Sequence, residues 1–144
     1  MAITFSARLG ITFQDYMKLG KLCIALACAA LAPLCAAGEI KPYDQAAFDR
    51  LATSGKPVVL SIYATWCTTC KAQQPIENEL MHAPAYRDVT MLTIDFDSAK
   101  PLLAKYHVAM QSTLIGFKAG KEVGRSVGDT TRAGIEGLFK KTLD

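Results

Sequence analysis

Two cysteines, Cys67 and Cys70, are separated by two threonines and follow an apolar run rich in β-branched residues. The segment after them has helical spacing, which places Cys67 at the N-terminus of a helix and Cys70 one turn inside it. Free backbone N–H groups and the helix dipole favour an anion there, so we expect a lowered pKa for Cys67. Cys70 would then attack a mixed disulfide on Cys67 and release the bound thiol. The spacing favours thiol–disulfide exchange, which requires no cofactor.

Two other interpretations of the pair have less support. A purely structural disulfide across so short a loop would constrain the unfolded chain little and stabilise the fold weakly. A structural zinc site needs about four ligands, and the pair supplies only two, with His82 and His107 as the remaining histidines. We interpret both histidines as surface or helix-end residues, so no metal site is predicted.

The other three cysteines, Cys23, Cys28 and Cys35, lie in an N-terminal apolar stretch. From Met17 the chain reads MKLGKLCIALACAALAPLCAAGE, in which two lysines precede an uncharged run that ends in small residues. This pattern is typical of a secretory signal peptide. We expect Met17 to be the initiating residue and cleavage to occur near Ala37. The chain would then consist of a leader over 1–37 and a single domain over 38–144.

An uncleaved membrane anchor is the alternative fate of this leader. Its uncharged run covers 17 residues, 22–38, and is interrupted by Pro33. That length falls short of the roughly 20 residues that span a bilayer comfortably. The sequence therefore predicts a periplasmic or otherwise exported protein, with membrane anchoring as the alternative.

The charge of the mature chain argues against a nucleic-acid partner. Removal of 1–37 takes away three basic residues and one acidic residue, which lowers the formal net charge from +3 to +1. Binding to nucleic acid would require a basic patch or stripe, which this balance does not indicate.

The pattern of the mature chain predicts strands that alternate with helices, and hence an α/β sheet. Asp44 is a predicted helix cap and Gly55 a helix stop. In the helix after the cysteines, we expect Ala72, Ile76 and Leu80 to form one buried stripe. The predicted helices cover 44–55, 68–81, 98–108 and 130–143, and the predicted strands cover 57–65, 89–97, 113–118 and 122–127.

Two stretches of the chain resemble the thioredoxin family. They read VVLSIYATWCTTCKAQQP and YHVAMQSTLIGFKAGKEVGRSVG, and the similarity extends over about 43–143. The resemblance implies a thioredoxin fold, with a central mixed four-stranded sheet flanked by helices and the active site at the start of the second helix. It also implies protein dithiol-disulfide oxidoreductase activity, with Cys67 as nucleophile and Cys70 as resolving cysteine.

The chain departs from the family pattern at a loop expected to face the cysteines. Where the family has a cis-proline, this sequence has Ser112 within Gln111-Ser112-Thr113. A cis bond before a non-proline residue costs about 2.5 to 4 kcal/mol, so this peptide is either trans in a reshaped loop or held cis by its surroundings. The loop residues, together with Trp66, are the predicted substrate-binding residues.

A second departure concerns a buried acid that many family members place six residues before the first cysteine. That position is Ser61 here, and a hydroxyl is no base at neutral pH. Deprotonation of Cys70 would therefore need water or another group. The intervening Thr68 and Thr69 are expected to tune the redox potential.

The resulting functional hypothesis is an exported enzyme that exchanges disulfides with protein substrates. Reductase or isomerase-like work is favoured over oxidation, because the chain lacks the large helical insertion of the periplasmic oxidases of this superfamily. We expect a monomer whose partners are protein thiols and disulfides and a membrane electron donor. The alternatives are a metal or cluster-binding module that uses Cys67 and Cys70, and an interaction domain with vestigial redox activity.

Overall fold

The computed structural model describes residues 37–144, so the predicted leader, its initiating Met17 and its three cysteines lie outside the described residues. The elements of the described part are β1 (Glu39–Pro42), α2 (Gln45–Thr53), β2 (Pro57–Tyr63), α3 (Thr68–His82), a 3-10 helix (Pro84–Tyr86), β3 (Thr90–Asp95), α4 (Lys100–Lys105), β4 (Thr113–Lys118), β5 (Lys121–Val127) and α5 (Arg132–Leu143). No helix within 37–144 is long and apolar enough to span a membrane.

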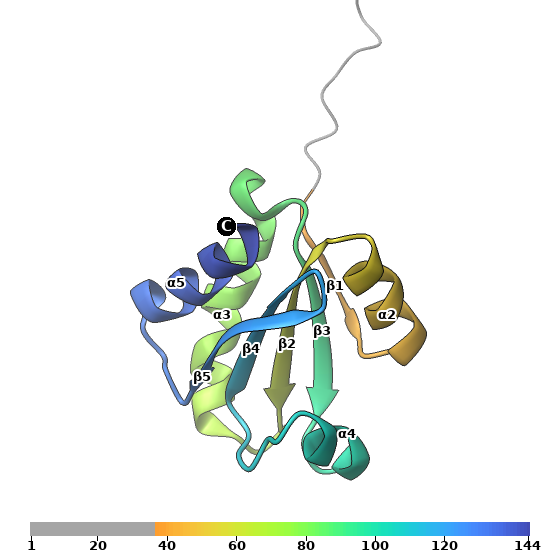
Figure 1. The fold of residues 1–144 in the computed structure, drawn as a ribbon. Coiled ribbons are helices and arrows are strands. Elements are labelled where there is room, and N and C mark those ends of the chain that lie inside the picture. The colour runs from red at the N-terminus through yellow and green to blue at the C-terminus, as the bar shows by residue number, and fades with distance from the viewer. Residues whose placement is uncertain (1–36) are drawn as a thin grey trace, which may run out of the picture. The chain divides into compact units, whose positions relative to one another are not determined.

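The predicted mixed sheet is present, but it has five strands instead of four. The strand order is β1-β3-β2-β4-β5, and Figure 1 shows helices on both faces. Strands β1, β3 and β2 run parallel, whereas β4 is antiparallel to both β2 and β5. The additional strand is β1, whose sequence EIKP is short, partly charged and largely exposed. Such a segment has no apolar alternation, so sequence patterning misses it.

Strand β2 lies at the centre of the sheet and is paired on both sides, with β3 and with β4. Its side chains alternate between the two faces because successive residues of a strand point in opposite directions. Val58, Leu60 and Ile62 belong to one core cluster, whereas Val59 belongs to the other. Ser61 therefore shares the face of Val59.

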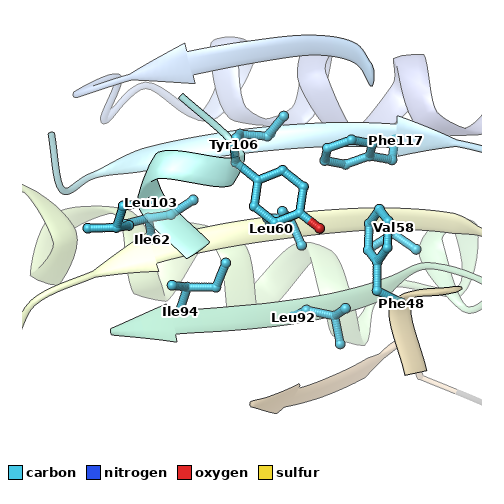
Figure 2. Close-up of a cluster of buried hydrophobic side chains, with 10 residues drawn as sticks. Phe48, Val58, Leu60, Ile62, Leu92, Ile94, Leu103, Tyr106 and Phe117 are labelled. Carbon is cyan, nitrogen blue, oxygen red and sulfur yellow. The ribbon is translucent and has the colours of Figure 1, made fainter. Parts of the chain in front are cut away.

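The first core lies between the sheet and helices α2 and α4 (Figure 2). Aromatic side chains from separate elements meet edge to face in it. The ring centroids of Phe48 and Phe117 are 5.2 Å apart, and those of Tyr106 and Phe117 are 5.8 Å apart. This packing joins α2, α4 and β4 to one layer of the sheet.

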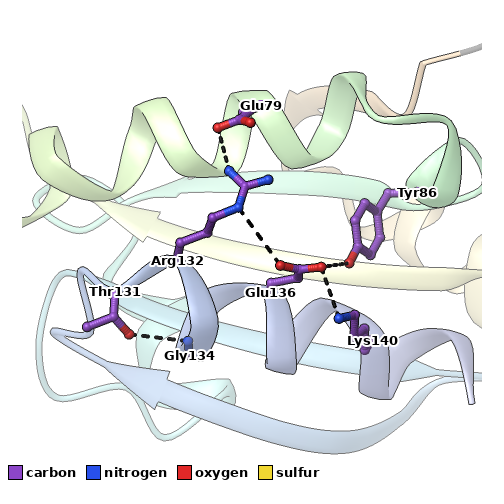
Figure 3. A network of polar contacts seen from close by, with 7 residues as sticks. All are labelled: Glu79, Tyr86, Thr131, Arg132, Gly134, Glu136 and Lys140. Atoms are coloured by element: carbon purple, nitrogen blue, oxygen red, sulfur yellow. Dashed lines mark hydrogen bonds and ion pairs between the residues drawn. The ribbon is translucent and has the colours of Figure 1, made fainter.

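The second core lies between the opposite face of the sheet and helices α3 and α5. As predicted, α5 buries Ile135, Leu138 and Phe139. Polar contacts join the outer surface of α5 to its neighbours, as Figure 3 shows: Arg132 at the start of α5 pairs with Glu79 of α3, and Glu136 of α5 accepts a hydrogen bond from Tyr86 of the 3-10 helix at 3.2 Å. Helix α5 is thus linked both to α3 and to the 3-10 helix that follows it.

The predicted buried stripe of α3 is wrong in part. Ala72 is exposed and Ile76 is only half-buried. Only Leu80 of the predicted set is fully buried, and it shares its face with two polar side chains, Gln73 and Glu77. A pattern based on hydropathy cannot find such a face, because each of these polar side chains is buried by virtue of a specific hydrogen-bond partner.

Because β2 lies at the centre of the sheet, we expect Leu60→Ala to lower the free energy of unfolding strongly. Leu60 is completely buried, and truncation of such a side chain costs about 2 to 5 kcal/mol of unfolding free energy. Urea denaturation checks this value. The same substitution at Leu143, which is 38% exposed, is the matched control and should cost well under half as much. Equal losses in the two variants would contradict the placement of the core.

Candidate active site

The two cysteines lie where β2 ends and α3 begins. Cys67 is the N-cap of the helix, and its Sγ accepts a hydrogen bond from the Cys70 backbone N–H at 3.0 Å. The two residues are joined by a disulfide, with their Cα atoms 5.3 Å apart. A sulfur at this position faces the positive end of the helix dipole, which is the geometry that the sequence spacing predicted.

Apolar side chains surround the disulfide, and one aromatic residue beside it faces solvent. Both cysteines are nearly inaccessible, at 2% and 3% exposure, and pack with Ala64, Tyr63 and Phe96. Trp66 is 57% exposed, and its indole N–H donates to Asp97 at 2.8 Å. An exposed indole held in one orientation provides an apolar surface next to a buried sulfur pair.

The loop that carries Gln111, Ser112 and Thr113 reaches the disulfide through a single side chain. The Ser112 hydroxyl oxygen lies 3.0 Å from the Cys67 sulfur and 3.2 Å from the Cys70 sulfur. Thr113 is buried, and its hydroxyl donates to the Met110 carbonyl at 2.7 Å. Gln111 is half-buried. Of the predicted loop residues, only Ser112 is shown in contact with the sulfurs.

The peptide before Ser112 is trans, since the described residues contain no cis peptide bond. Ser112 instead has a φ of 59°, in the left-handed region that residues with a side chain seldom occupy. Its backbone is held on both sides: its N–H donates to the Ile62 carbonyl at 2.9 Å, and its own carbonyl accepts from the Gly128 N–H at 2.9 Å. Of the two possibilities for this loop, the structure shows the trans peptide in a reshaped loop.

Gln73, which sequence reasoning did not single out, adds a further support to this loop. Its side-chain amide lies 3.3 Å from the Ser112 carbonyl and donates to the Asp129 carbonyl at 2.8 Å. The Asp129 carboxylate in turn accepts from the Thr131 backbone N–H at 2.8 Å, and a Cβ on Gly134 would overlap with that carboxylate. The only sequence signal for Gln73 is a large amide three residues after Cys70, on the same helix face.

A buried carboxyl group is present beside Ser61, although it comes from a helix and not from the strand position that the family pattern indicates. The Ser61 hydroxyl donates to Glu77 of α3 at 3.0 Å. Burial raises the pKa of Glu77 above its ordinary value, and the hydrogen bond from Ser61 opposes this increase with a smaller effect. Glu77 thus supplies a buried carboxyl group beside position 61.

A cavity of about 430 Å³ opens beside this pair. Its lining consists of Ile40, Ser61, Tyr63, Gln74, Glu77, Asn78, Met91 and Thr93. Neither cysteine lines it. The cavity therefore lies next to the buried acid and is separate from the sulfur pair.

Metal-ligand clusters are not found in the part of the chain from 37 to 144, where no three His, Cys, Asp or Glu side chains are arranged to hold an ion. His82 lies at the end of α3, and its Nδ1 is 2.6 Å from the Asn78 carbonyl of the same helix. His107 follows α4, with a φ of 52°. These placements agree with their interpretation as helix-end residues.

Comparison with known proteins identifies the family. The family model described as Thioredoxin matches residues 39–141. The chain is 31% identical to a thioredoxin of Mycoplasmoides gallisepticum over 97 residues, which cover 67% of this chain and 95% of the relative. It is 38% identical to Thioredoxin-2 of Saccharomyces cerevisiae over 86 residues, covering 60% of this chain and 77% of that protein.

Solved structures agree with this result. The crystal structure of Trxlp from Edwardsiella tarda matches with a TM-score of 0.67 and 39% sequence identity, covering 69% of this chain and 98% of that one. A mixed sheet flanked by helices, with a cysteine pair where a central strand enters a helix, defines the class of thioredoxin-fold proteins. This chain belongs to the thioredoxin family, and it is a protein disulfide oxidoreductase with Cys67 and Cys70 as its cysteine pair.

The raised pKa of Glu77 predicts a pH-dependent stability. Below the unfolded-state pKa the carboxyl is neutral in both states; as pH rises through the higher folded-state pKa, the folded protein must bury a charge and loses stability. Glu77→Gln should therefore be more stable than the wild type at pH 7 and equally stable near pH 4, as measured by urea denaturation.

Glu79→Gln is the control for this prediction, because Glu79 lies on the same helix with a side chain that is 65% exposed. Its removal should not stabilise the protein at pH 7. A Glu77→Gln variant with the same pH profile as the wild type would contradict the assigned titration.

Proposed function

We propose that the chain is an exported enzyme that reduces or isomerises disulfides of protein substrates. The main support is the position of Cys67 as N-cap of α3, with its sulfur accepting the Cys70 N–H and bonded to Cys70. Such a pair takes up two electrons when the disulfide is reduced to two thiols and releases them when it re-forms, at a site that favours a thiolate.

Reduction of a substrate proceeds by two exchanges. The Cys67 thiolate attacks one sulfur of the substrate disulfide, so that a Cys67–substrate bond forms and the electron pair of the broken bond leaves on the other substrate sulfur, which takes a proton. Cys70 then loses its proton and attacks Cys67. The second substrate thiol departs, the substrate has gained two electrons and two protons, and Cys67 and Cys70 are oxidised to the disulfide.

The surface beside the sulfurs suits an extended, partly apolar polypeptide. Trp66 precedes Cys67 and is exposed, and Met110, 55% exposed, lies two residues before Ser112. Together with Gln111 they form the side chains through which we propose that a substrate segment reaches Cys67. Apolar contacts from Trp and Met are adaptable, which fits an enzyme that accepts many sequences.

The direction of electron flow is inferred from the compactness of the domain. The connections between elements within 37–144 are short, the longest being 106–112, so no large helical insertion covers the site. A reductase in an oxidising compartment must be recharged with electrons after each turnover, because reduction of the substrate leaves its cysteine pair oxidised. We therefore propose a membrane electron donor as its redox partner and a monomer as the working unit.

The exchange function is tested with reduced, leaderless protein and insulin as the substrate. We expect catalysed insulin reduction in the presence of dithiothreitol, a loss of at least about 100-fold for Cys67→Ser, and a trapped mixed disulfide with Cys70→Ser, seen on non-reducing gels. Two findings would argue against the proposal: full activity of Cys67→Ser, or a disulfide form that oxidises dithiol peptides while the reduced form leaves insulin intact.

The export proposal rests on the leader sequence and is tested separately. Full-length protein expressed in a Gram-negative bacterium should appear in the periplasmic fraction with a mature N-terminus near residue 38, as determined by mass spectrometry. A variant with Lys18 and Lys21 changed to glutamate should be retained in the cytoplasm. Recovery of the uncleaved wild-type chain from the cytoplasm would refute export.

A further inference from the structure

Ser112 occupies a position in which its hydroxyl group touches both reacting atoms. The hydroxyl oxygen is 3.0 Å from the Cys67 sulfur and 3.2 Å from the Cys70 sulfur, and Ser112 is only 3% exposed. Sulfurs in a disulfide carry no hydrogen, so the hydroxyl is the donor in either contact. One hydroxyl hydrogen can therefore be directed to one sulfur at a time by rotation about a single bond.

The backbone of Ser112 is held much more firmly than its hydroxyl. Hydrogen bonds with Ile62, Gly128 and Gln73 fix its N–H and carbonyl groups, and these groups are thereby occupied within the protein. The left-handed φ of 59° costs free energy in a residue with a side chain, and such strain concentrates at functional sites. The fold thus holds a rotatable donor at a fixed distance from both sulfurs.

We propose that the Ser112 hydroxyl is a catalytic hydrogen-bond donor that stabilises whichever cysteine sulfur carries the negative charge during exchange. This inference rests on the proposed exchange function. In the reduced enzyme the hydroxyl donates to the Cys67 thiolate. Once Cys67 is bonded to substrate, the hydroxyl turns to Cys70, whose thiolate forms next. A thiolate is a far stronger acceptor than a disulfide sulfur, so the donor favours the reduced, ionised pair over the disulfide.

This assignment differs from a role in binding the substrate backbone. The Ser112 N–H donates to β2 and its carbonyl accepts from two groups of the protein, so the side chain is the part that remains for chemistry. The Cys67 sulfur therefore has two donors in this structure, the Cys70 N–H of the helix and the Ser112 hydroxyl of the loop.

The test compares the pH profile of Cys67 alkylation by iodoacetamide in the reduced wild type, Ser112→Ala and Ser112→Gly. Both substitutions remove the hydroxyl, whereas only glycine also removes the cost of the positive φ. We expect the midpoint of the profile to rise by about one pH unit in both variants. Because a more basic thiolate is more nucleophilic, the variants should react roughly threefold slower below the wild-type midpoint and roughly threefold faster at high pH.

The equilibrium with glutathione gives a second readout. Loss of the donor destabilises the reduced form, so the variants should be more reducing, by about tenfold in the equilibrium constant or about 30 mV at a pH where Cys67 is ionised. Ser98→Ala, a substitution of an exposed serine, serves as the control and should match the wild type in both measurements.

Three outcomes decide the matter. Parallel shifts in Ser112→Ala and Ser112→Gly support the proposal. Wild-type profiles in both variants overturn it, and so does a shift confined to Ser112→Gly, which would trace the effect to the backbone, because Ser112→Ala lacks the hydroxyl as well. Alkylation involves no protein disulfide, so a chain that shows the shift and yet fails to reduce insulin would count against the proposed function, whereas the hydrogen bond from Ser112 to the thiolate would stand.

Discussion

The site depends on the way the central strand passes into helix α3. Strand β2 is paired on both sides and buried on both faces, so its end is fixed in space by the whole sheet. Cys67 is the N-cap of the helix that follows, and the Cys70 backbone N–H in its first turn donates to that sulfur. If the strand-to-helix junction followed an edge strand instead, the backbone that carries the thiol would be able to move. The same two cysteines would then have no fixed electrostatic environment.

Most of the fold follows from the sequence because its strands and helices carry clear periodic patterns. The buried run of β2 and the apolar face of α5 are examples in which local pattern and tertiary packing agree. Strand β1 was missed because its hydrogen bonds with β3, and not its side chains, make it a strand. A strand that forms through its backbone hydrogen bonds alone leaves no hydropathy pattern in the sequence.

The candidate site was predictable only where it depends on local geometry. The placement of Cys67 at a helix N-terminus follows from residue spacing alone. Gln73 and Glu77 were not predicted, because their burial depends on partners that are distant in the chain, Ser112 and Ser61 respectively. The conformation of Ser112 depends in the same way on distant partners. Its backbone N–H donates to Ile62 of β2, and its carbonyl accepts from the Gly128 N–H. Hydrogen bonds between buried polar groups that are distant in the chain form only in the folded protein, so the sequence pattern does not reveal them.

The chain of contacts from Gly134 through Asp129 and Gln73 to Ser112 has an evolutionary consequence. Any side chain at position 134 would displace the Asp129 carboxylate, whose backbone carbonyl holds the amide that also supports the sulfur-facing loop. A shift of the Asp129 backbone that accompanied this displacement would reach the sulfur-facing loop through the Gln73 amide. We expect these four positions to vary together among descendants of this sequence, so that an exchange at one is inherited with a compensating exchange at another.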